Sequence, residues 1–233
     1  MSDTRRHHIR TEDLHKVYTD NGMTVPALRG INLEIHSGEF TAIVGPSGSG
    51  KTTLLNIISG LDKPTRGMVW LDERSISDMS GAELCDFRRD HIGFVFQAYN
   101  LIPVLTVEEN IEYIMQLQKV PAAARHRRVE EILKDVGLDG FASRFPSKLS
   151  GGQQQRVAIA RAMVSRPLMI LADEPTANID SKTGAALLDM MRSLNEEKGM
   201  TFIFSTHDKM VMEKARRIVV IKDGIIDQDE IRE

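Results

Sequence analysis

The chain has 233 residues, of which 30 are basic and 33 acidic, so its formal net charge at pH 7 is −3 with the histidines neutral. This balance supplies neither the basic surface of a nucleic-acid-binding protein nor a polybasic membrane anchor. With 41% hydrophobic and 27% charged residues, the composition excludes a mainly disordered chain and is typical of a globular protein.

The N-terminal residues 1–8 contain no apolar stretch of the kind found in a signal peptide, and we expect a solvated tail there, followed by one domain over residues 9–233. The longest segment without a formal charge, residues 91–107, is too short and too polar for a membrane-spanning helix, which needs about 20 apolar residues. The single Cys85 cannot form a disulfide within the chain. These features predict a protein of the reducing cytoplasm that does not cross a membrane.

Several apolar patterns predict strands. Ile31, Leu33 and Ile35 alternate with polar residues, which is typical of an antiparallel sheet with one wet face. The later runs are continuously apolar, as in a parallel sheet that is buried on both faces. They are residues 40–44, 92–96, 168–172, 201–204 and 218–221, the last of which leads into a hairpin at Asp223-Gly224.

Helix signals lie between these strands. Ser80 with Glu83 and Thr106 with Glu109 have the spacing of capping boxes, while Asp180 can begin a helix that Gly199 ends. Residues 53–59 also have a helical pattern. From about residue 106 to 164 the pattern is almost entirely helical, so we expect a helical insert at about residues 98–165 within an α/β core.

A glycine-rich motif follows the strand at residues 40–44 and precedes the helix at 53–59. It fits the pattern G-x-x-x-x-G-K-S/T of a phosphate-binding P-loop. The glycines allow backbone N–H groups to curl around a phosphate, the helix presents its positive N-terminus, and the lysine adds a full charge against the β and γ oxygens. The threonine after the lysine offers its hydroxyl to Mg²⁺. The nucleotide-binding residues predicted here are Gly45, Pro46, Ser47, Gly48, Ser49, Gly50, Lys51, Thr52 and Thr53.

A second glycine-rich helix start is Leu149-Ser150-Gly151-Gly152-Gln153. Its serine and glycine amides can bind a terminal phosphate through the helix N-terminus, without a lysine. Taken alone, the string is also an ordinary helix N-cap. The stretch that follows is amphipathic: Val157, Ile159, Ala160 and Met163 are apolar, whereas Gln154, Gln155 and Arg156 are polar.

The order of these motifs resembles an ATP-binding cassette (ABC) ATPase. Leu149 to Gln153 stands about a hundred residues after the P-loop lysine and shortly before an apolar strand that ends in Asp173-Glu174, and the resemblance covers nearly the whole chain. It implies a P-loop NTPase fold of the α/β class: a RecA-like core with an antiparallel β subdomain and a helical subdomain. The pattern of predicted strands and helices agrees with that fold.

The resemblance also implies roles for single residues. Asp173 would support Mg²⁺ together with Thr52 and Gln97, and Glu174 would orient and polarise the attacking water. His207, in Ser205-Thr206-His207-Asp208, matches the switch histidine of the family, which contacts the γ-phosphate. Lys51 and Gln97 complete the predicted catalytic set.

Three further assignments concern nucleotide contacts. Tyr18, at the end of the first strand, resembles the aromatic residue that stacks on adenine. Asp180, in Ala177-Asn178-Ile179-Asp180, matches the loop that crosses the dimer interface, with Ile179 where leucine is commoner. Ser150, Gly151, Gly152 and Gln153 would bind the γ-phosphate of the ATP held by the other subunit.

Three strings place the chain near the lipoprotein-release and macrolide-export group of this family, namely residues 20–28, 90–101 and 149–156. The resemblance implies an ATP- and Mg²⁺-dependent head-to-tail dimer at the cytoplasmic face of the membrane, peripherally attached. Its partner would be a separate integral membrane permease that docks on the apolar segment from Gln97 to Leu105, and no nucleic acid is involved. The activity would be export or lipoprotein release driven by ATP hydrolysis. The sequence does not identify the cargo or the permease.

Other functions share parts of this pattern. A branch of the same group acts in cell division or signalling without transport, and the sequence does not separate it from the transporters. A P-loop kinase would share Gly45 to Thr52 but not Leu149 to Gln153. ABC ATPases of the ribosome have two cassettes in one chain, and DNA-repair relatives need a long coiled-coil or zinc insert, which 233 residues with one cysteine do not accommodate.

Overall fold

The structure is a computed structural model that describes residues 7–20 and 22–232. Residues 1–6 of the expected tail lie outside the described residues. Strand β1 (His7–Asp20) already includes the last two residues that we assigned to the tail.

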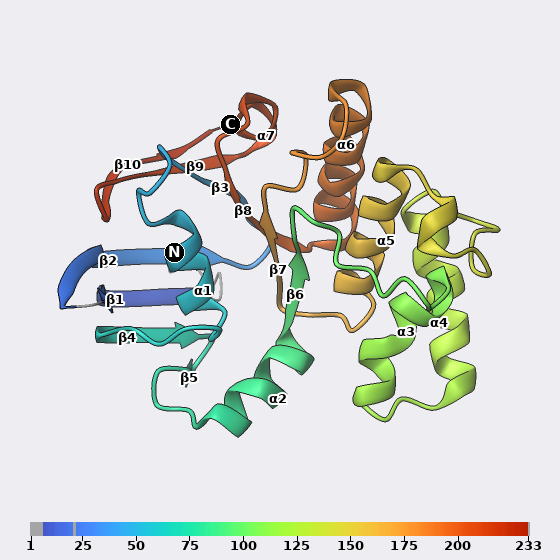
Figure 1. The fold of residues 1–233 in the computed structure, drawn as a ribbon, viewed down its shortest axis with the longest axis horizontal. Coiled ribbons are helices and arrows are strands. Elements are labelled where there is room, and N and C mark those ends of the chain that lie inside the picture. The colour runs from blue at the N-terminus through green and yellow to red at the C-terminus, as the bar shows by residue number, and fades with distance from the viewer. Residues whose placement is uncertain (1–6, 21, 233) are drawn as a thin grey trace, which may run out of the picture.

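Two sheets form the framework (Figure 1). The smaller is antiparallel between its neighbouring strands, in the order β2-β1-β4-β5. The larger has the order β10-β9-β3-β8-β7-β6 and is parallel except for β10, which pairs antiparallel with β9. The strands after β1 are β2 (Met23–His36), β3 (Phe40–Val44), β4 (Arg66–Leu71), β5 (Arg74–Ser75), β6 (Ile92–Val95), β7 (Met169–Asp173), β8 (Thr201–Thr206), β9 (Arg217–Lys222) and β10 (Ile225–Ile231).

The hydrophobic pattern explains both sheets. Strands β3 and β8 are buried at every residue, as their continuous apolar runs predict, whereas β2 alternates buried and exposed residues in its second half. The predicted hairpin at Asp223-Gly224 joins β9 to β10. We did not predict β4, because its Gly67 weakens the strand pattern. A Cβ atom there would lie 2.3 Å from the carbonyl oxygen of Asp13 on β1, so only glycine allows these two backbones to approach.

Four helices begin at the caps that the sequence indicates, whereas α1 begins at Lys51, two residues before the predicted start at Thr53. Ser80, Thr106 and Ser150 each form a complete capping box with the residue three positions on, and the Asp180 side chain accepts a bond from the N–H of Thr183 at 3.0 Å. The helices are α1 (Lys51–Ile58), α2 (Gly81–His91), α3 (Val107–Leu117), α4 (Ala122–Asp135), α5 (Gly151–Met163), α6 (Ser181–Lys198) and α7 (Lys209–Lys214), with a 3-10 turn at Pro146–Lys148.

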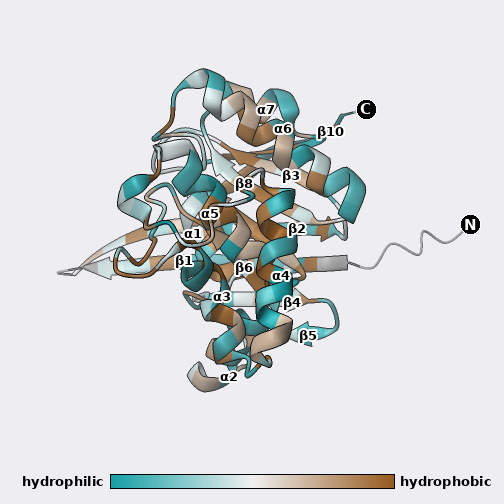
Figure 2. Ribbon diagram, turned by 90° about the vertical axis from the view of Figure 1, so that its right-hand side faces the viewer, coloured by the Kyte–Doolittle hydropathy of each residue, from teal (hydrophilic) through white to brown (hydrophobic). Residues whose placement is uncertain are grey.

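Two hydrophobic cores lie on the two faces of the larger sheet. Successive residues of β8 point to opposite faces: Phe202 and Phe204 join the core beneath helices α3 to α6, while Ile203 joins the core shared with α1 and the antiparallel sheet. Helices α3, α4 and α5 form the expected helical insert, which Figure 2 views from its outer side. Across the described residues, every helix is too short or too polar to span a lipid bilayer.

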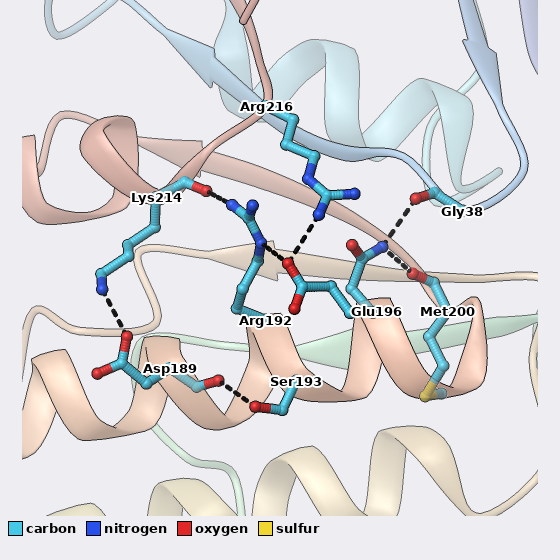
Figure 3. A network of polar contacts seen from close by, with 9 residues as sticks. Gly38, Asp189, Arg192, Ser193, Glu196, Met200, Lys214 and Arg216 are labelled. Atoms are coloured by element: carbon cyan, nitrogen blue, oxygen red, sulfur yellow. Dashed lines mark hydrogen bonds and ion pairs between the residues drawn. The ribbon is translucent and has the colours of Figure 1, made fainter. Parts of the chain in front are cut away.

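A polar network fastens α6 to the core (Figure 3). The buried Asn195 of α6 donates from Nδ2 to the carbonyl oxygens of Gly38, at 2.8 Å, and Met200, at 2.6 Å. On the other side of the network, Arg192 donates to the carbonyl of Lys214 at 2.6 Å. One buried amide thus joins the loops that precede β3 and β8, so α6 helps to set the position of both central strands.

We expect Asn195→Ala to lower the free energy of unfolding by about 1 to 2 kcal/mol, because two backbone carbonyls lose their donor. The matched control is Ser193→Ala on the same helix, whose exposed hydroxyl bonds only to the Asp189 carbonyl of its own helix. That change should stay within about 0.5 kcal/mol of the wild type. Urea unfolding followed by circular dichroism measures both, and equal effects would contradict the role of Asn195.

Candidate active site

The P-loop connects the end of β3 to α1 and has a conformation that only glycine allows at two points. Gly45 has φ +154°, and a Cβ atom there would lie 2.1 Å from the carbonyl oxygen of Ile221. Gly50, the N-cap of α1, has φ +107°, and its Cβ would lie 2.6 Å from the carbonyl oxygen of Ala27. The loop is therefore held tightly against neighbouring backbone while its amides precede a helix N-terminus.

Lys51 is buried and donates from Nζ to the carbonyl oxygens of Gly45 at 2.8 Å and Pro46 at 3.0 Å. The ammonium group thus lies against the backbone of the same loop whose N–H groups would bind a phosphate. The hydroxyl of Ser49 is buried and has no hydrogen-bond partner within the described part of the chain. Ser47, Gly48 and Thr52 are exposed, while Thr53 is half-buried. A cation, helix amides and an unused hydroxyl in one loop match the needs of a phosphate group.

Two carboxylates lie at the carboxyl end of β7, beside β8. Asp173 is the last residue of β7, and Glu174 follows with φ +46°, a left-handed conformation that is uncommon for a residue with a side chain. The Glu174 carboxylate accepts bonds from Thr206 Oγ1 at 2.9 Å and from the N–H of His207 at 3.2 Å. Its Oε1 atom lies 2.5 Å from His207 Nδ1. The structure therefore brings together Glu174 and His207, two residues predicted from motifs that are 33 positions apart.

Burial raises the pKa of Asp173 above its ordinary value. A hydrogen bond with Ser205 opposes this shift, the charge of Glu174 adds to it, and the charge of Lys51 opposes it. A half-buried carboxylate beside a second carboxylate is costly to ionise unless positive charge is near. The carboxylate of Asp173, at the end of β7, and the hydroxyl of Thr52, in the first turn of α1, offer hard oxygen ligands of the kind that Mg²⁺ prefers. The residues present therefore fit a magnesium ion.

Ser150 begins α5 as an N-cap. Its hydroxyl accepts from the N–H of Gln153 at 3.3 Å, and Gln153 Oε1 accepts from the N–H of Ser150 at 3.0 Å. A Cβ atom on Gly152 would lie 2.2 Å from the Thr183 side chain, so glycine lets α5 approach α6 closely. In Figure 1 the P-loop helix α1 and helix α5 lie on opposite sides of β7. The two helix starts that were predicted to bind phosphate thus belong to separate parts of the molecule.

These loops are connected by side chains whose contacts no sequence motif predicted. Asn178 donates from Nδ2 to the carbonyl of Gln97 at 2.9 Å, and the hydroxyl of Tyr99 donates to the carbonyl of Asn178 at 3.1 Å. Gln155, which we placed on the polar side of its helix, is fully buried, and its Nε2 donates to the carbonyl of Pro175 at 2.8 Å. The only sequence signal for its burial is its spacing: Gln155 lies three residues after Gly152 and four before Ile159, on the buried side of α5. Its polar amide gives no such indication.

The remaining predicted residues are placed as follows. Tyr18 is 41% exposed, donates from its hydroxyl to Asp62 at 2.9 Å and has Lys16 Nζ 4.8 Å from its ring centroid. Gln97 is exposed near the start of the loop that follows β6. Asp180 caps α6, as predicted, and is itself exposed. The role of each in nucleotide binding stays a prediction.

Sequence comparison gives a family. The family described as ABC transporter matches residues 28–177 of this chain. The chain is 47% identical over 226 residues to the uncharacterized ABC transporter ATP-binding protein MJ0796 of Methanocaldococcus jannaschii, an alignment that covers 95% of this chain and 96% of that protein. It is 45% identical over 221 residues to the macrolide export ATP-binding/permease protein MacB of Brucella melitensis, covering 95% of this chain but 34% of MacB.

Solved structures agree. The dimeric structure of MJ0796 in a post-hydrolysis state, bound to ADP and Pi, matches with a TM-score of 0.87 at 45% identity over 97% of this chain and 99% of that one. CbiO1 of Clostridium perfringens, part of an ABC transporter complex, matches with a TM-score of 0.88 at 31% identity over 97% of this chain and 89% of that one. The expected P-loop fold and the suspected family are thereby confirmed. The chain belongs to the ABC transporter family and is one of its ATP-binding, ATP-hydrolysing subunits.

Proposed function

We propose that two copies of this chain form a head-to-tail dimer that hydrolyses two ATP molecules with Mg²⁺ and drives a separate membrane permease. The observation that carries this proposal is the separation of the P-loop at α1 from the Ser150 helix start at α5. A single chain offers each ATP only one of these two phosphate-binding groups. A second copy in head-to-tail arrangement would supply the other, and the dimer in which MJ0796 was solved supports this arrangement.

Hydrolysis would occur at the carboxyl edge of the large sheet. Lys51 and the P-loop amides would hold the β- and γ-phosphates, and Glu174 would orient a water for attack on the γ-phosphorus. Thr206 and His207 hold the Glu174 carboxylate from two sides, which fixes the direction in which it can accept a proton from that water. His207, 77% of whose side chain is exposed, is free to contact the γ-phosphate as well.

Thr52, Asp173 and Gln97 would hold Mg²⁺ through oxygen atoms. When bound, the ion neutralises charge on the phosphate oxygens and lowers the cost of ionising Asp173. Tyr18 would stack on the adenine, with its hydroxyl anchored by Asp62. Asp180 and its loop would lie at the interface between the two copies.

The permease would dock at the apolar segment after Gln97. Its side chains divide into two groups: Leu101 packs against the main core, while Ile102 is 37% and Val104 77% exposed. Beside them a hollow of about 510 Å³ is lined by residues of this segment, of the Pro146–Lys148 turn and of α5. An apolar hollow of this size fits a short amphipathic helix. The protein would then sit at the cytoplasmic face of a membrane as a peripheral subunit.

The same segment gives a route for coupling. Asn178 bonds the carbonyl of Gln97, and Tyr99 bonds the carbonyl of Asn178, so the docking segment is joined to the loop that would contact the second copy. Closure of the dimer on ATP would therefore move the segment that touches the permease. The activity would be export or lipoprotein release, and the name of MacB, a macrolide export protein that combines ATP-binding and permease functions, supports export.

We expect Glu174→Gln to retain ATP affinity while lowering turnover by about 10² or more, because the amide cannot accept a proton from the water. The trapped ATP should hold the dimer closed, which gel filtration with MgATP would detect. Glu213→Gln, an exposed carboxylate on α7, is the control and should leave turnover unchanged. Normal hydrolysis by Glu174→Gln would refute the assignment.

The head-to-tail arrangement predicts complementation between two inactive variants. Lys51→Ala should weaken nucleotide binding, whereas Gly151→Asp should bind ATP but block hydrolysis by opposing a negative charge to the partner's γ-phosphate. A mixture should recover part of the activity, because a heterodimer has one intact site. Gly151→Ala adds the same Cβ atom, 2.7 Å from the Tyr99 hydroxyl, without the charge. This control should retain more activity than Gly151→Asp, and equal loss in both would point to crowding instead of charge.

For the docking segment we expect Val104→Glu to abolish co-purification with the membrane permease, while melting temperature and ATP affinity stay unchanged. The charge would be placed in an apolar interface without a partner. Ile231→Glu on β10, which alters a residue that is 79% exposed, is the matched control and should keep the permease. Leu101→Glu should instead lower the melting temperature, because Leu101 packs on the core. If Val104→Glu co-purified with as much permease as Ile231→Glu does, the docking site would not lie at this segment.

A further inference from the structure

A second cavity lies far from the nucleotide site, beneath the helical insert. Its volume is about 690 Å³, within the range of small-molecule sites. One wall comes from α4, and the opposite walls come from the residues that connect α5 to β7 and α6 to β8. Figure 2 shows α4 at the front of this side of the molecule, largely hydrophilic on its outer surface.

The lining combines apolar and cationic side chains. Ile132, Met163, Leu168 and Met200 supply apolar surface. The charged lining residues are Arg128, Lys134, Arg166 and Lys198 against Glu131 and Asp135. Lys198 is already paired with Asp135. The cavity therefore carries an excess of positive charge over a partly apolar floor.

The two arginines of the lining, Arg128 and Arg166, make no polar contact through their side chains in the described part of the chain. Within the described residues, neither Arg128 nor Arg166 has a side-chain hydrogen bond or an ion pair, and Arg128 Nε is buried without a partner. Burial and the nearby positive charge of Arg166 lower the pKa of Arg128, with Glu131 opposing. The two guanidinium groups line the same space and repel each other, and the buried Nε–H of Arg128 lacks an acceptor, whereas Arg166 is exposed. An oxyanion between them would relieve both costs, and guanidinium binds carboxylate or phosphate with two parallel hydrogen bonds.

The cavity is separate from the site of hydrolysis. Leu168 and Met200 directly precede β7 and β8, whereas Asp173 and Thr206 end these same strands. At about 3.3 Å per residue, the two sites are roughly 15 to 20 Å apart, at opposite ends of strands β7 and β8. A ligand in the cavity would touch α4 of the helical insert and the start of two core strands at once, without contacting ATP.

We propose that this cavity binds a small acidic amphiphile, an anionic head on an apolar body, with the head between Arg128 and Arg166. The apolar body lies along Ile132, Met163, Leu168 and Met200. Carboxylate and phosphate heads share the chemistry that the arginines recognise. Because the ligand joins α4 to the core, its binding restrains the helical insert.

The test titrates the full chain with decanoate, decyl phosphate, decanol and inorganic phosphate, below micelle-forming concentrations. Calorimetry gives the affinities, and the ¹³C-methyl signals of Met163 and Met200 report occupancy of the cavity. We expect decanoate or decyl phosphate to shift both methyl signals and to bind at least tenfold more tightly than decanol or inorganic phosphate. Saturating MgATP should not displace them, since the two sites lie at opposite ends of strands β7 and β8.

Arg128→Gln and Arg166→Gln should each weaken binding about tenfold or more, as expected for loss of a charge-assisted hydrogen bond. Arg127→Gln, an exposed neighbour on α4 that does not line the cavity, is the matched control and should change nothing. Neither cavity variant should lower the melting temperature, because neither arginine has a partner to lose. Equal binding of decanol, equal binding of inorganic phosphate, displacement by MgATP, or equal weakening by Arg127→Gln would overturn the proposal.

Discussion

The arrangement of the site depends on the parallel register between β7 and β8. Asp173 pairs with Ser205 across this ladder, so the residues that follow each strand emerge side by side. Because both strands run in the same direction, their carboxyl ends lie side by side, and this alone brings Glu174 into contact with Thr206 and His207. The register itself is fixed by burial: every residue of β8 is buried, and a slip by one position would exchange the Phe204 face with the Ile203 face. The hydrophobic pattern of the core thus aligns the polar residues at its edge.

The loops at this edge are joined to one another by amide side chains. Gln155 reaches from α5 to the backbone after β7, and Asn178 reaches from that same loop to the backbone of Gln97. Such bonds are directional and short, so a loop cannot shift without breaking or carrying its neighbour. The loop that would face a second copy and the segment that would face a permease are therefore mechanically connected within one chain.

Most of the fold could be predicted because its strands and helices carry strong local signals. The apolar runs of β3, β7 and β8 and the caps at Ser80, Thr106 and Asp180 are determined by residues within a few positions of one another. The P-loop and the Asp173-Glu174 pair could also be placed, because a short motif fixes their backbone surroundings. Strand β4 was missed because its Gly67 is explained only by the approach of β1, a distant segment. Gln155 and Asn178 were missed for the same reason, since their partners are backbone carbonyls that no local pattern reveals.

The left-handed backbone at Glu174 sets stability against activity at one position. A side chain in this conformation costs of the order of 1 kcal/mol relative to glycine. Selection for stability alone would therefore favour glycine here, and the loss of the carboxylate would go with it. The bonds from Thr206 and His207, which glycine could not receive, hold the Glu174 carboxylate in place in this conformation. A screen for thermostable variants of this protein would test the conflict directly: substitutions that relax residue 174 would be selected by heat but would remove the carboxylate to which we assign the positioning of the attacking water.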